Sequence, residues 1–156
     1  MSKKERIVTD YNIKTATLKS MDIIRLGLVD NGISYIVPVN FAYYNNAIYF
    51  HTGLKGRKIP LLKKSEKISF QADRFDSLKT HDTACGHSSY FASIHGEGIP
   101  VFLESKEDKY FGLDLLMEKY TGKKWNDFSE KILNVTNVIR IDITKLEAVI
   151  HKPKDL

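Results

Sequence analysis

Several groups that bind anions stand close together in one short segment, YFHTGLKGRK. Thr52 offers a hydroxyl, Gly53 and Gly56 allow backbone N–H groups to approach a ligand, and Arg57 and Lys58 supply a planar fork of donors and a point charge. The residues before the segment alternate like the end of a strand. Those after it resemble the start of an apolar helix, whose N-terminus favours negative charge. We therefore expect a phosphate site, although Walker and Rossmann glycine spacing is absent and an ordinary strand–turn–helix junction would look similar.

The net charge of the chain comes from the same region. The sequence has 24 Lys and Arg against 19 Asp and Glu, a formal net charge of +5. Six basic residues and one acidic residue lie within residues 55–67, which leaves 18 of each sign elsewhere. A nucleic-acid binder would spread its positive charge over a longer face. The concentrated patch suits a small phosphorylated ligand better, although a solvated helix face would explain some of the charges. We expect no nucleic-acid partner.

Length and composition indicate a single globular domain over residues 1–156. The chain is long enough to bury a core without disulfides or metals, and 42% hydrophobic with 28% charged residues is ordinary for a soluble protein. A single cysteine, Cys85, excludes an internal disulfide and favours a reducing compartment. The first residues lack the apolar stretch of a signal peptide, and no apolar run approaches the roughly 20 residues that cross a bilayer. We expect a cytoplasmic protein with no membrane partner.

The first half of the chain predicts a short helix and three strands. Asp10 is expected to cap a helix over residues 10–21. The sequence Asp30-Asn31-Gly32 is a strong hairpin signal, and Asn45-Asn46 is a second turn. The predicted strands span residues 23–29, 34–42 and 47–51. We expect these strands to form an antiparallel meander.

The second half predicts further strands and helices. A helix should run from about Arg57 to Lys64, and a second should be capped by Ser105 and end at Gly122. Gly96 and Gly98 suggest a bend or bulge in a long strand. The predicted strands span residues 67–75, 90–103 and 138–150, with a polar loop over residues 76–89. Six or so antiparallel strands with a few helices predict a mainly β protein, a small barrel with helices around it.

The order and spacing of these elements resemble the FMN-binding split-barrel superfamily, which includes pyridoxamine-5′-phosphate oxidases, and within it the nitroimidazole-resistance (Nim-type) flavoproteins. The resembling blocks are RLGLV at 25–29, YIVPVNF at 35–41, IYFHTG at 48–53, GRK at 56–58, DRF at 73–75, CG at 85–86, YFASIHGEG at 90–98 and LLMEKY at 115–120. The resemblance covers most of the chain. It implies a six-stranded antiparallel split β-barrel with two to four peripheral helices.

The resemblance also implies an FMN site. The residues expected to bind the cofactor are Val37, Pro38, Val39, Asn40, His51, Thr52, Gly53, Gly56, Arg57, Lys58 and Ser93. Residues 37–40 would lie along the isoalloxazine edge, and the segment from His51 to Lys58 would hold the phosphate. Asn40 offers a donor and an acceptor to the ring, although an amide satisfied by backbone is equally consistent with its position. Pro38 inside a strand suggests a place where ladder pairing stops.

In function, the resemblance implies a flavin-dependent reductase that acts on nitroaromatic, 5-nitroimidazole-like acceptors, in a homodimer with flavin at the subunit interface. The alternatives are a non-catalytic FMN-binding protein and a haem-handling one. Vitamin B6 oxidation is not expected, because the chain ends at Leu156 soon after its last predicted strand. In addition, Gly56 stands where those oxidases usually have serine.

The histidines and the cysteine carry weaker hypotheses. His81, Cys85 and His87 could ligate zinc, but the second ligand pair of a structural site is absent. A Cys–His nucleophile pair would need an oxyanion hole that nothing in the sequence indicates. We therefore expect no metal and assign no catalytic residue. Cys85 is expected to be partly buried near the flavin, His51 to lie beside the phosphate, and Tyr120 and Trp125 to pack at a helix end.

Overall fold

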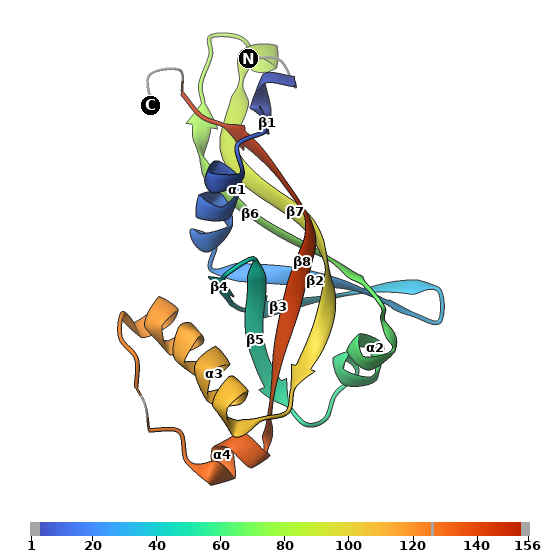
Figure 1. Cartoon of the computed structure of the whole chain (residues 1–156). Helices are drawn as coiled ribbons and strands as arrows, with labels where there is room; N and C mark the ends of the chain where they lie inside the picture. Colours follow the sequence, from blue (N-terminus) through green and yellow to red (C-terminus); the bar gives the residue numbers. More distant parts are fainter. Residues whose placement is uncertain (1–3, 126, 154–156) are drawn as a thin grey trace.

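The structure, a computed structural model, describes residues 4–125 and 127–153 and contains one coiled antiparallel sheet with helices around it (Figure 1). The strand order is β3-β2-β6-β7-β8-β5-β4, with β1 paired to β8. The strands are β1 (Ile7–Val8), β2 (Ile23–Asp30), β3 (Ile33–Asn40), β4 (Ala42–Tyr44), β5 (Ala47–Gly53), β6 (Ile68–Lys79), β7 (Ser88–Leu103) and β8 (Thr136–His151). The helices are α1 (Tyr11–Lys19), α2 (Lys58–Lys64), α3 (Lys106–Thr121) and α4 (Glu130–Asn134), with 3-10 turns at Lys4–Arg6 and Ala84–Gly86.

This architecture confirms the predicted mainly β class, with four α-helices in the described residues. Six of the strands have at least seven residues and correspond to the six that the sequence predicts. β1 and β4 are additional short strands of two and three residues, too short to leave an alternating pattern in the sequence. No helix of the described residues is long and apolar enough to span a membrane.

Two tight turns form where the sequence predicts them. Asn31 and Gly32 have φ angles of 51° and 79°, and Asn45 and Asn46 have φ angles of 44° and 60°. Positive φ at both central residues is the geometry that matches the twist of a two-residue hairpin. The first turn joins β2 to β3, and the second joins β4 to β5.

The predicted meander is wrong. Among the described residues β3 pairs only with β2, whereas β4 pairs with β5 and β5 pairs with β8 on the other side of the sheet. The change occurs at Phe41, which is fully buried and whose backbone N–H donates to the Tyr120 hydroxyl at 3.0 Å instead of to a strand. The β2–β3 hairpin and the β4–β5 hairpin therefore form the two opposite edges of the sheet.

The polar loop predicted over residues 76–89 is shorter than expected. β6 continues to Lys79 and pairs with the start of β7, after an irregularity in register between Phe75 and Ser77. The side chains from Asp73 to Lys79 are exposed on both faces of β6, so no burial pattern marked this segment as a strand. The predicted bulge is confirmed by a second register shift between Glu97 and Gly98.

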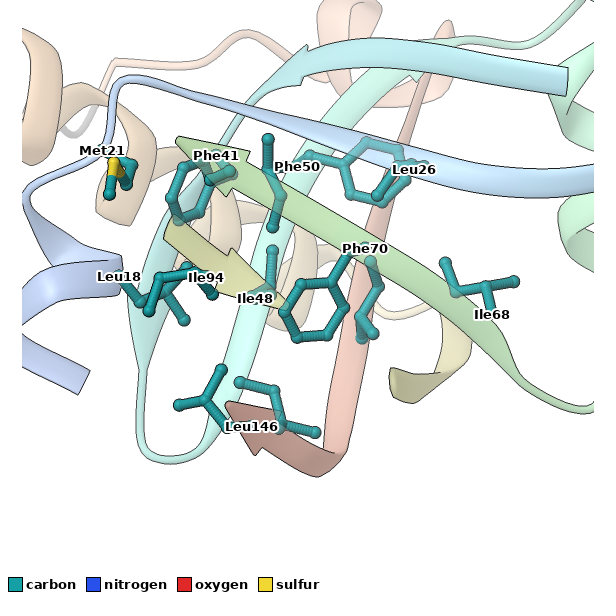
Figure 2. Close-up of a cluster of buried hydrophobic side chains, with 14 of the residues drawn as sticks. Leu18, Met21, Leu26, Phe41, Ile48, Phe50, Ile68, Phe70, Ile94 and Leu146 are labelled. Carbon is teal, nitrogen blue, oxygen red and sulfur yellow. The ribbon is translucent and has the colours of Figure 1, made fainter. Parts of the chain in front are cut away.

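The main core fills the barrel between β2, β5, β6, β7 and β8 (Figure 2). Phe41, Phe50 and Phe70 are its largest fully buried residues, and Leu18 and Met21 from the α1 region close one end. A methyl group at Gly96 would lie 2.1 Å from the Phe70 ring, so the barrel packs tightly against the backbone of β7.

A second core joins α3 and α4 to β4, β5 and β8. Ser105 caps α3 by accepting from the Asp108 N–H at 3.0 Å, and Gly122 ends it with a φ of 77°, as predicted. Gly112 allows close contact, because a methyl group there would lie 2.6 Å from Val138. The buried residues of this core are Ala42, Ala47, Tyr49, Leu103, Leu113, Leu116, Leu133 and Val138.

Candidate functional site

The predicted phosphate segment begins at the end of β5 and continues into the first residues of α2. Thr52 is almost fully buried, at 9% exposure, whereas His51 and Gly53 are exposed. Side chains alternate along a strand, so Thr52 shares the barrel face of Ile48 and Phe50, and His51 lies on the opposite face. The segment therefore presents its exposed groups at one end of the barrel.

Gly56 has a φ of 130°, a conformation that residues with a side chain rarely adopt. A serine at this position would strain the backbone. The backbone conformation therefore favours glycine at this position, where the oxidases mentioned above usually have serine. The loop conformation differs from the one that a serine would favour.

Arg57 is held by the hairpin formed by β2 and β3. Its Nε donates to Asp30 Oδ2 at 2.8 Å, and its guanidinium carbon lies 4.4 Å from the centroid of the Tyr35 ring. In the described residues neither Nη atom of Arg57 has a hydrogen-bond partner. Arg57 thus keeps the two donors that can bind a phosphate side by side.

Of the other basic side chains in residues 55–67, some contact a carboxylate or an aromatic ring and others have no ion-pair partner. Lys67 pairs with Glu97 at 3.5 Å, and Lys63 Nζ lies 5.3 Å from the centroid of the Phe102 ring. Within residues 4–125 and 127–153, Lys55, Lys58 and Lys64 have no ion-pair partner. Lys58 directly follows Arg57 and is half-buried, so these two residues form the best-placed pair of cations in the patch.

Strand β3 presents the predicted ring-binding residues on two different faces. Val37 and Val39 are half-buried and pack against the main core, on the face of Tyr35. Pro38 and Asn40 are exposed on the outer face. Pro38 pairs with Arg25 on the β2 side, and no described strand pairs with the other side of β3, so the ladder ends at this edge as the proline suggests. Proline is tolerated because β3 is an edge strand and its other side has no partner strand in the described residues.

The outer face of the sheet has a hollow of about 270 Å³ beside β3. Arg25 on its border donates to Asp73 at 2.9 Å and to Gln71 at 3.3 Å. The lining residues are Arg25, Gly27, Ile36, Ser69, Phe70, Gln71 and His95. Exposed apolar side chains surround this polar group, with Ile23, Val29, Ile36 and Phe75 exposed by 46%, 59%, 64% and 67%.

Ser93 lies on the same outer face but away from the other predicted residues. It pairs with Asp73 of β6 and Val149 of β8. Between β3 and β7 the sheet contains β2 and β6, so Ser93 is three strand spacings, about 14 Å, from β3. Within one copy of the chain, Ser93 is therefore not on a strand next to β3, whose hairpin contacts Arg57.

The environment of His51 lowers the pKa of its imidazole below the ordinary value, because nearby protein atoms remove water from a ring that stays exposed on one side. A neutral imidazole can donate or accept a hydrogen bond depending on its tautomer. Phosphate nearby would oppose this effect by favouring the charged form.

The remaining candidates lie elsewhere. Cys85 is exposed in the turn between β6 and β7, so the prediction that it is partly buried is wrong. The described residues contain no group of three or more His, Cys, Asp or Glu that could hold a metal ion. His81 Nδ1 accepts from the Thr83 N–H at 3.2 Å, and His87 Nδ1 lies 3.0 Å from the Thr83 carbonyl, so both rings shape the turn.

Sequence reasoning missed Asp30 and Tyr35, which orient Arg57, and the polar group of Arg25, Gln71 and Asp73. The hairpin signal at Asn31-Gly32 was enough to place Asp30 near the turn. Nothing in the sequence showed that this turn would lie against the start of α2, since the contact spans 27 residues. Arg25 and Gln71 pair across β2 and β6, a register that only the folded sheet fixes.

Comparison with solved structures shows the same fold in several proteins, two of which are named as binding FAD. A proposed 5-nitroimidazole antibiotic resistance protein from Bacteroides thetaiotaomicron is 24% identical, with a TM-score of 0.80 over 91% of this chain and 84% of that one. The FAD and heme binding protein from Mycobacterium smegmatis is 14% identical, with a TM-score of 0.85 over 95% and 74%. A FAD-binding protein from Mesorhizobium loti is 19% identical, with a TM-score of 0.70 over 94% and 98%.

No curated protein sequence matches the chain significantly. The family described as Pyridoxamine 5'-phosphate oxidase matches over residues 15–149, which extends from α1 to the distal end of β8. This range contains β2 to β7, all but the last two residues of β8, and every residue of the candidate site. The chain therefore belongs to the pyridoxamine 5'-phosphate oxidase family and has its flavin-binding split-barrel fold.

Proposed function

We propose that this chain binds FMN and acts as a flavin-dependent reductase of small nitroaromatic acceptors. The main observation in support of the proposal is the orientation of the Arg57 guanidinium and its unused hydrogen-bond donors. Asp30 and Tyr35 fix its guanidinium and leave both Nη groups unbonded among the described residues, next to Lys58. A cationic fork prepared in this way fits a terminal phosphate, which FMN has and riboflavin lacks.

The phosphate would be bound by Arg57 and Lys58, with the exposed backbone of Gly53 and Gly56 nearby. His51 and Thr52 stand at the strand end that leads into this loop. These groups fit a dianion, because they combine two cations, backbone N–H donors and an imidazole that the free protein keeps in its neutral form and that a nearby anion would help to protonate. Together these groups would form the phosphate-binding part of the site.

The ring would lie along the free edge of β3. Val37 and Val39 offer apolar contact, and Pro38 and Asn40 form the exposed side of the same strand. The Asn40 amide can pair with the donor and acceptor positions of a flavin ring. We assign Ser93 to the flavin bound by the other subunit of a dimer, because it is remote from β3 within one chain.

A bound flavin supplies the electron chemistry, so the site needs no acid, base or nucleophile of its own. The side chains of the chain bind the phosphate, orient the ring and exclude water. This division of labour agrees with the absence of a catalytic cluster in the sequence.

We further propose that the protein is a homodimer with the flavin at the subunit interface. The outer face carries an apolar rim around Arg25, Gln71 and Asp73, and a planar ring is best buried from both sides. A twofold axis would bring two copies of this self-complementary face together. The dimer would then cover the ring that one chain leaves open.

One fold neighbour is named as a FAD and heme binding protein, which keeps haem and FAD as alternatives to FMN. A non-catalytic flavin carrier would use the same residues without turnover. An absorption spectrum separates the ligands, since flavins and haem absorb at different wavelengths.

The test of the reductase is a stopped-flow experiment. The FMN-loaded protein is reduced without oxygen and mixed with a 5-nitroimidazole, with free reduced FMN as the control. We expect flavin absorbance to return faster on the protein than in free solution. Reoxidation no faster than that of free FMN would refute the reductase and leave a carrier.

A further inference from the structure

The junction between β3 and β4 is held by the last turn of α3. Phe41 separates the two strands, and its backbone N–H donates to the Tyr120 hydroxyl at 3.0 Å. The one proton of this hydroxyl can donate to the carbonyl oxygen of Asp22 or to that of Phe41, which lies 3.2 Å away. A single side chain therefore bonds to the backbone of both strands of the β2–β3 ladder, just beyond the point where the ladder ends.

Lys119, the residue before Tyr120, holds the same junction from a second direction. Its Nζ donates to the Met21 carbonyl at 2.6 Å and lies 3.6 Å from the centroid of the Phe41 ring. Phe41 is fully buried, and its side chain lies near Met21 at this end of the core (Figure 2). A shift of the backbone at Phe41 would therefore break contacts of its ring as well as its hydrogen bonds to Tyr120.

Asn40 lies immediately before Phe41 and is the last residue of β3. It pairs with Ile23, which immediately follows Asp22, so the Tyr120 hydroxyl bonds to the residue next to each member of this pair. The Asn40 side chain is exposed, and among the described residues its amide has no hydrogen-bond partner. A free amide on a fixed backbone is suited to ligand binding, because little conformational freedom is lost when the ligand binds.

We propose that Tyr120, supported by Lys119, is a positioning residue for flavin binding, which fixes the end of β3 and so sets where the Asn40 amide meets the ring. The inference rests on the function proposed above, in which Asn40 binds the ring. Tyr120 itself is not proposed to contact the flavin, because the backbone of Asp22 and Phe41 occupies its hydroxyl.

The loss of the hydroxyl would act on Asn40 through the backbone. Without it the Phe41 N–H would have no partner, and the end of β3 would be free to move together with Asn40. A shift of about 1 Å exceeds the range of donor–acceptor distances, about 2.7–3.2 Å, that a hydrogen bond allows. The amide would then lose its hydrogen bonds to the ring.

The test is a double-mutant cycle on Tyr120→Phe and Asn40→Ala, with the dissociation constant of riboflavin as the readout. Riboflavin has the ring and no phosphate, so the measurement does not depend on Arg57 and Lys58. We expect each single variant to raise this dissociation constant about three- to tenfold, the effect of one neutral hydrogen bond. Because Tyr120 acts through Asn40, adding Tyr120→Phe to Asn40→Ala should raise it by less than about twofold more.

The midpoint potential of bound riboflavin, measured at saturation, is a second readout. Hydrogen bonds to the ring tune the potential of a flavin, so Tyr120→Phe and Asn40→Ala should shift it in the same direction. The double variant should have the potential of Asn40→Ala. A loss of fold stability alone would leave the potential unchanged.

Tyr110→Phe is the matched control, because the Tyr110 hydroxyl accepts from the Phe128 backbone N–H at 3.0 Å elsewhere on α3. It should lower the free energy of unfolding in urea but leave the affinity and potential of riboflavin unchanged. Lys119→Gln removes the charge over the Phe41 ring and keeps Tyr120. It should give a smaller loss of affinity that also depends on Asn40, and it decides the question if Tyr120→Phe folds poorly.

The cycle separates failure of this inference from failure of the proposed function. If Asn40→Ala weakens riboflavin binding but Tyr120→Phe does not, or if the two effects are additive, the positioning role is overturned and the proposed flavin site stands. If Asn40→Ala leaves riboflavin binding unchanged, this inference is overturned together with the placement of the ring on β3.

Discussion

Arg57 Nε lies 2.8 Å from Asp30 Oδ2, which joins the residue before α2 to the last residue of β2. The same hairpin contributes the Tyr35 ring, 4.4 Å from the guanidinium carbon. Two contacts from different directions fix the plane of the guanidinium. A ligand that binds to a side chain ordered in this way loses less conformational entropy than one that binds to a free side chain. The β2–β3 hairpin thus orients Arg57 for the proposed phosphate site, although Asp30 and Tyr35 are not themselves proposed to contact the phosphate.

Replacing Asp30 with Asn should therefore weaken FMN binding. The ion pair is partly exposed, with side-chain exposures of 55% for Arg57 and 24% for Asp30, so its loss should change the free energy of unfolding by about 1 kcal/mol or less. Loss of the orientation of Arg57 should raise the FMN dissociation constant about three- to tenfold. Fluorescence titration and urea unfolding measure the two effects separately.

Glu97→Gln is the matched control, because it breaks the exposed pair with Lys67 elsewhere on the sheet. It should leave FMN affinity unchanged. Tighter FMN binding by Asp30→Asn would contradict the positioning role and show that Asp30 competes with the phosphate for Arg57.

Replacing Ile36 with Asp should dissociate the proposed dimer. Ile36 is 64% exposed on the outer face and lines its hollow, so a second copy would bury it beside its own counterpart. A buried, unpaired carboxylate costs several kcal/mol. Light scattering should give the dimer mass for the unmodified protein and the monomer mass for the variant.

Ile132→Asp provides the comparison, since Ile132 is 48% exposed on α4, away from that face. It should remain dimeric. A monomeric unmodified protein in the presence of saturating FMN would rule out the interface altogether.

FMN binding should raise the pKa of His51. Burial lowers the pKa of the ring in the free protein, and a nearby phosphate dianion favours the protonated form. NMR titration of the His51 ring protons with and without FMN measures the change directly. An identical pKa in both states would remove His51 from the proposed phosphate site.

The same lowered pKa has a consequence for stability in the absence of FMN. The unfolded chain binds a proton at His51 more readily than the folded chain, so acidification favours unfolding. The contribution of His51 is complete above the ordinary histidine pKa of about 6.5 and is lost as the pH falls through the lower folded-state value. His51→Gln should flatten this part of the profile in urea unfolding between pH 7.5 and pH 5.

Replacing Gly96 with Ala should destabilise the barrel. The new methyl group would lie 2.1 Å from the Phe70 ring and 2.7 Å from the Lys145 carbonyl oxygen, in a core that is already filled. Overpacking of this kind costs about 1–3 kcal/mol. Gly53→Ala adds a methyl group with no heavy atom within 4 Å, so its free energy of unfolding should change little. Equal losses in the two variants would show that the Phe70 ring moves aside without cost.

Local signals in the sequence predicted much of the fold. Asp10, Ser105 and Gly122 act as helix caps where expected, and Asn31-Gly32 and Asn45-Asn46 form the turns. Each of these features depends on the residue itself and its neighbours in the chain. They could be recognised because a cap or a turn satisfies backbone groups locally.

Pairing between distant strands could not be predicted in the same way. The sequence pattern of β5 would be the same whether the strand paired with β3, as in the predicted meander, or with β8, as observed, so the pattern does not identify the partner. The distal half of β6 is exposed on both faces and carries no periodic signal. For the site, residue types indicated an anion, but the contact of Arg57 with Asp30 and the separation of Ser93 from β3 depend on the order of strands in the sheet.

The central claim is that Arg57 and Lys58 bind the flavin phosphate. Its most direct test compares dissociation constants for FMN and riboflavin in the unmodified protein, in Arg57→Ala with Lys58→Ala, and in Lys63→Ala with Lys64→Ala. We expect the first pair to weaken FMN binding at least about 100-fold, since charge-assisted hydrogen bonds contribute about 1.5–3 kcal/mol each, and to leave riboflavin binding unchanged. The second pair, further along α2, should have little effect on either ligand. Equal affinity of the unmodified protein for FMN and riboflavin, or a larger loss from the Lys63 and Lys64 pair, would contradict the claim.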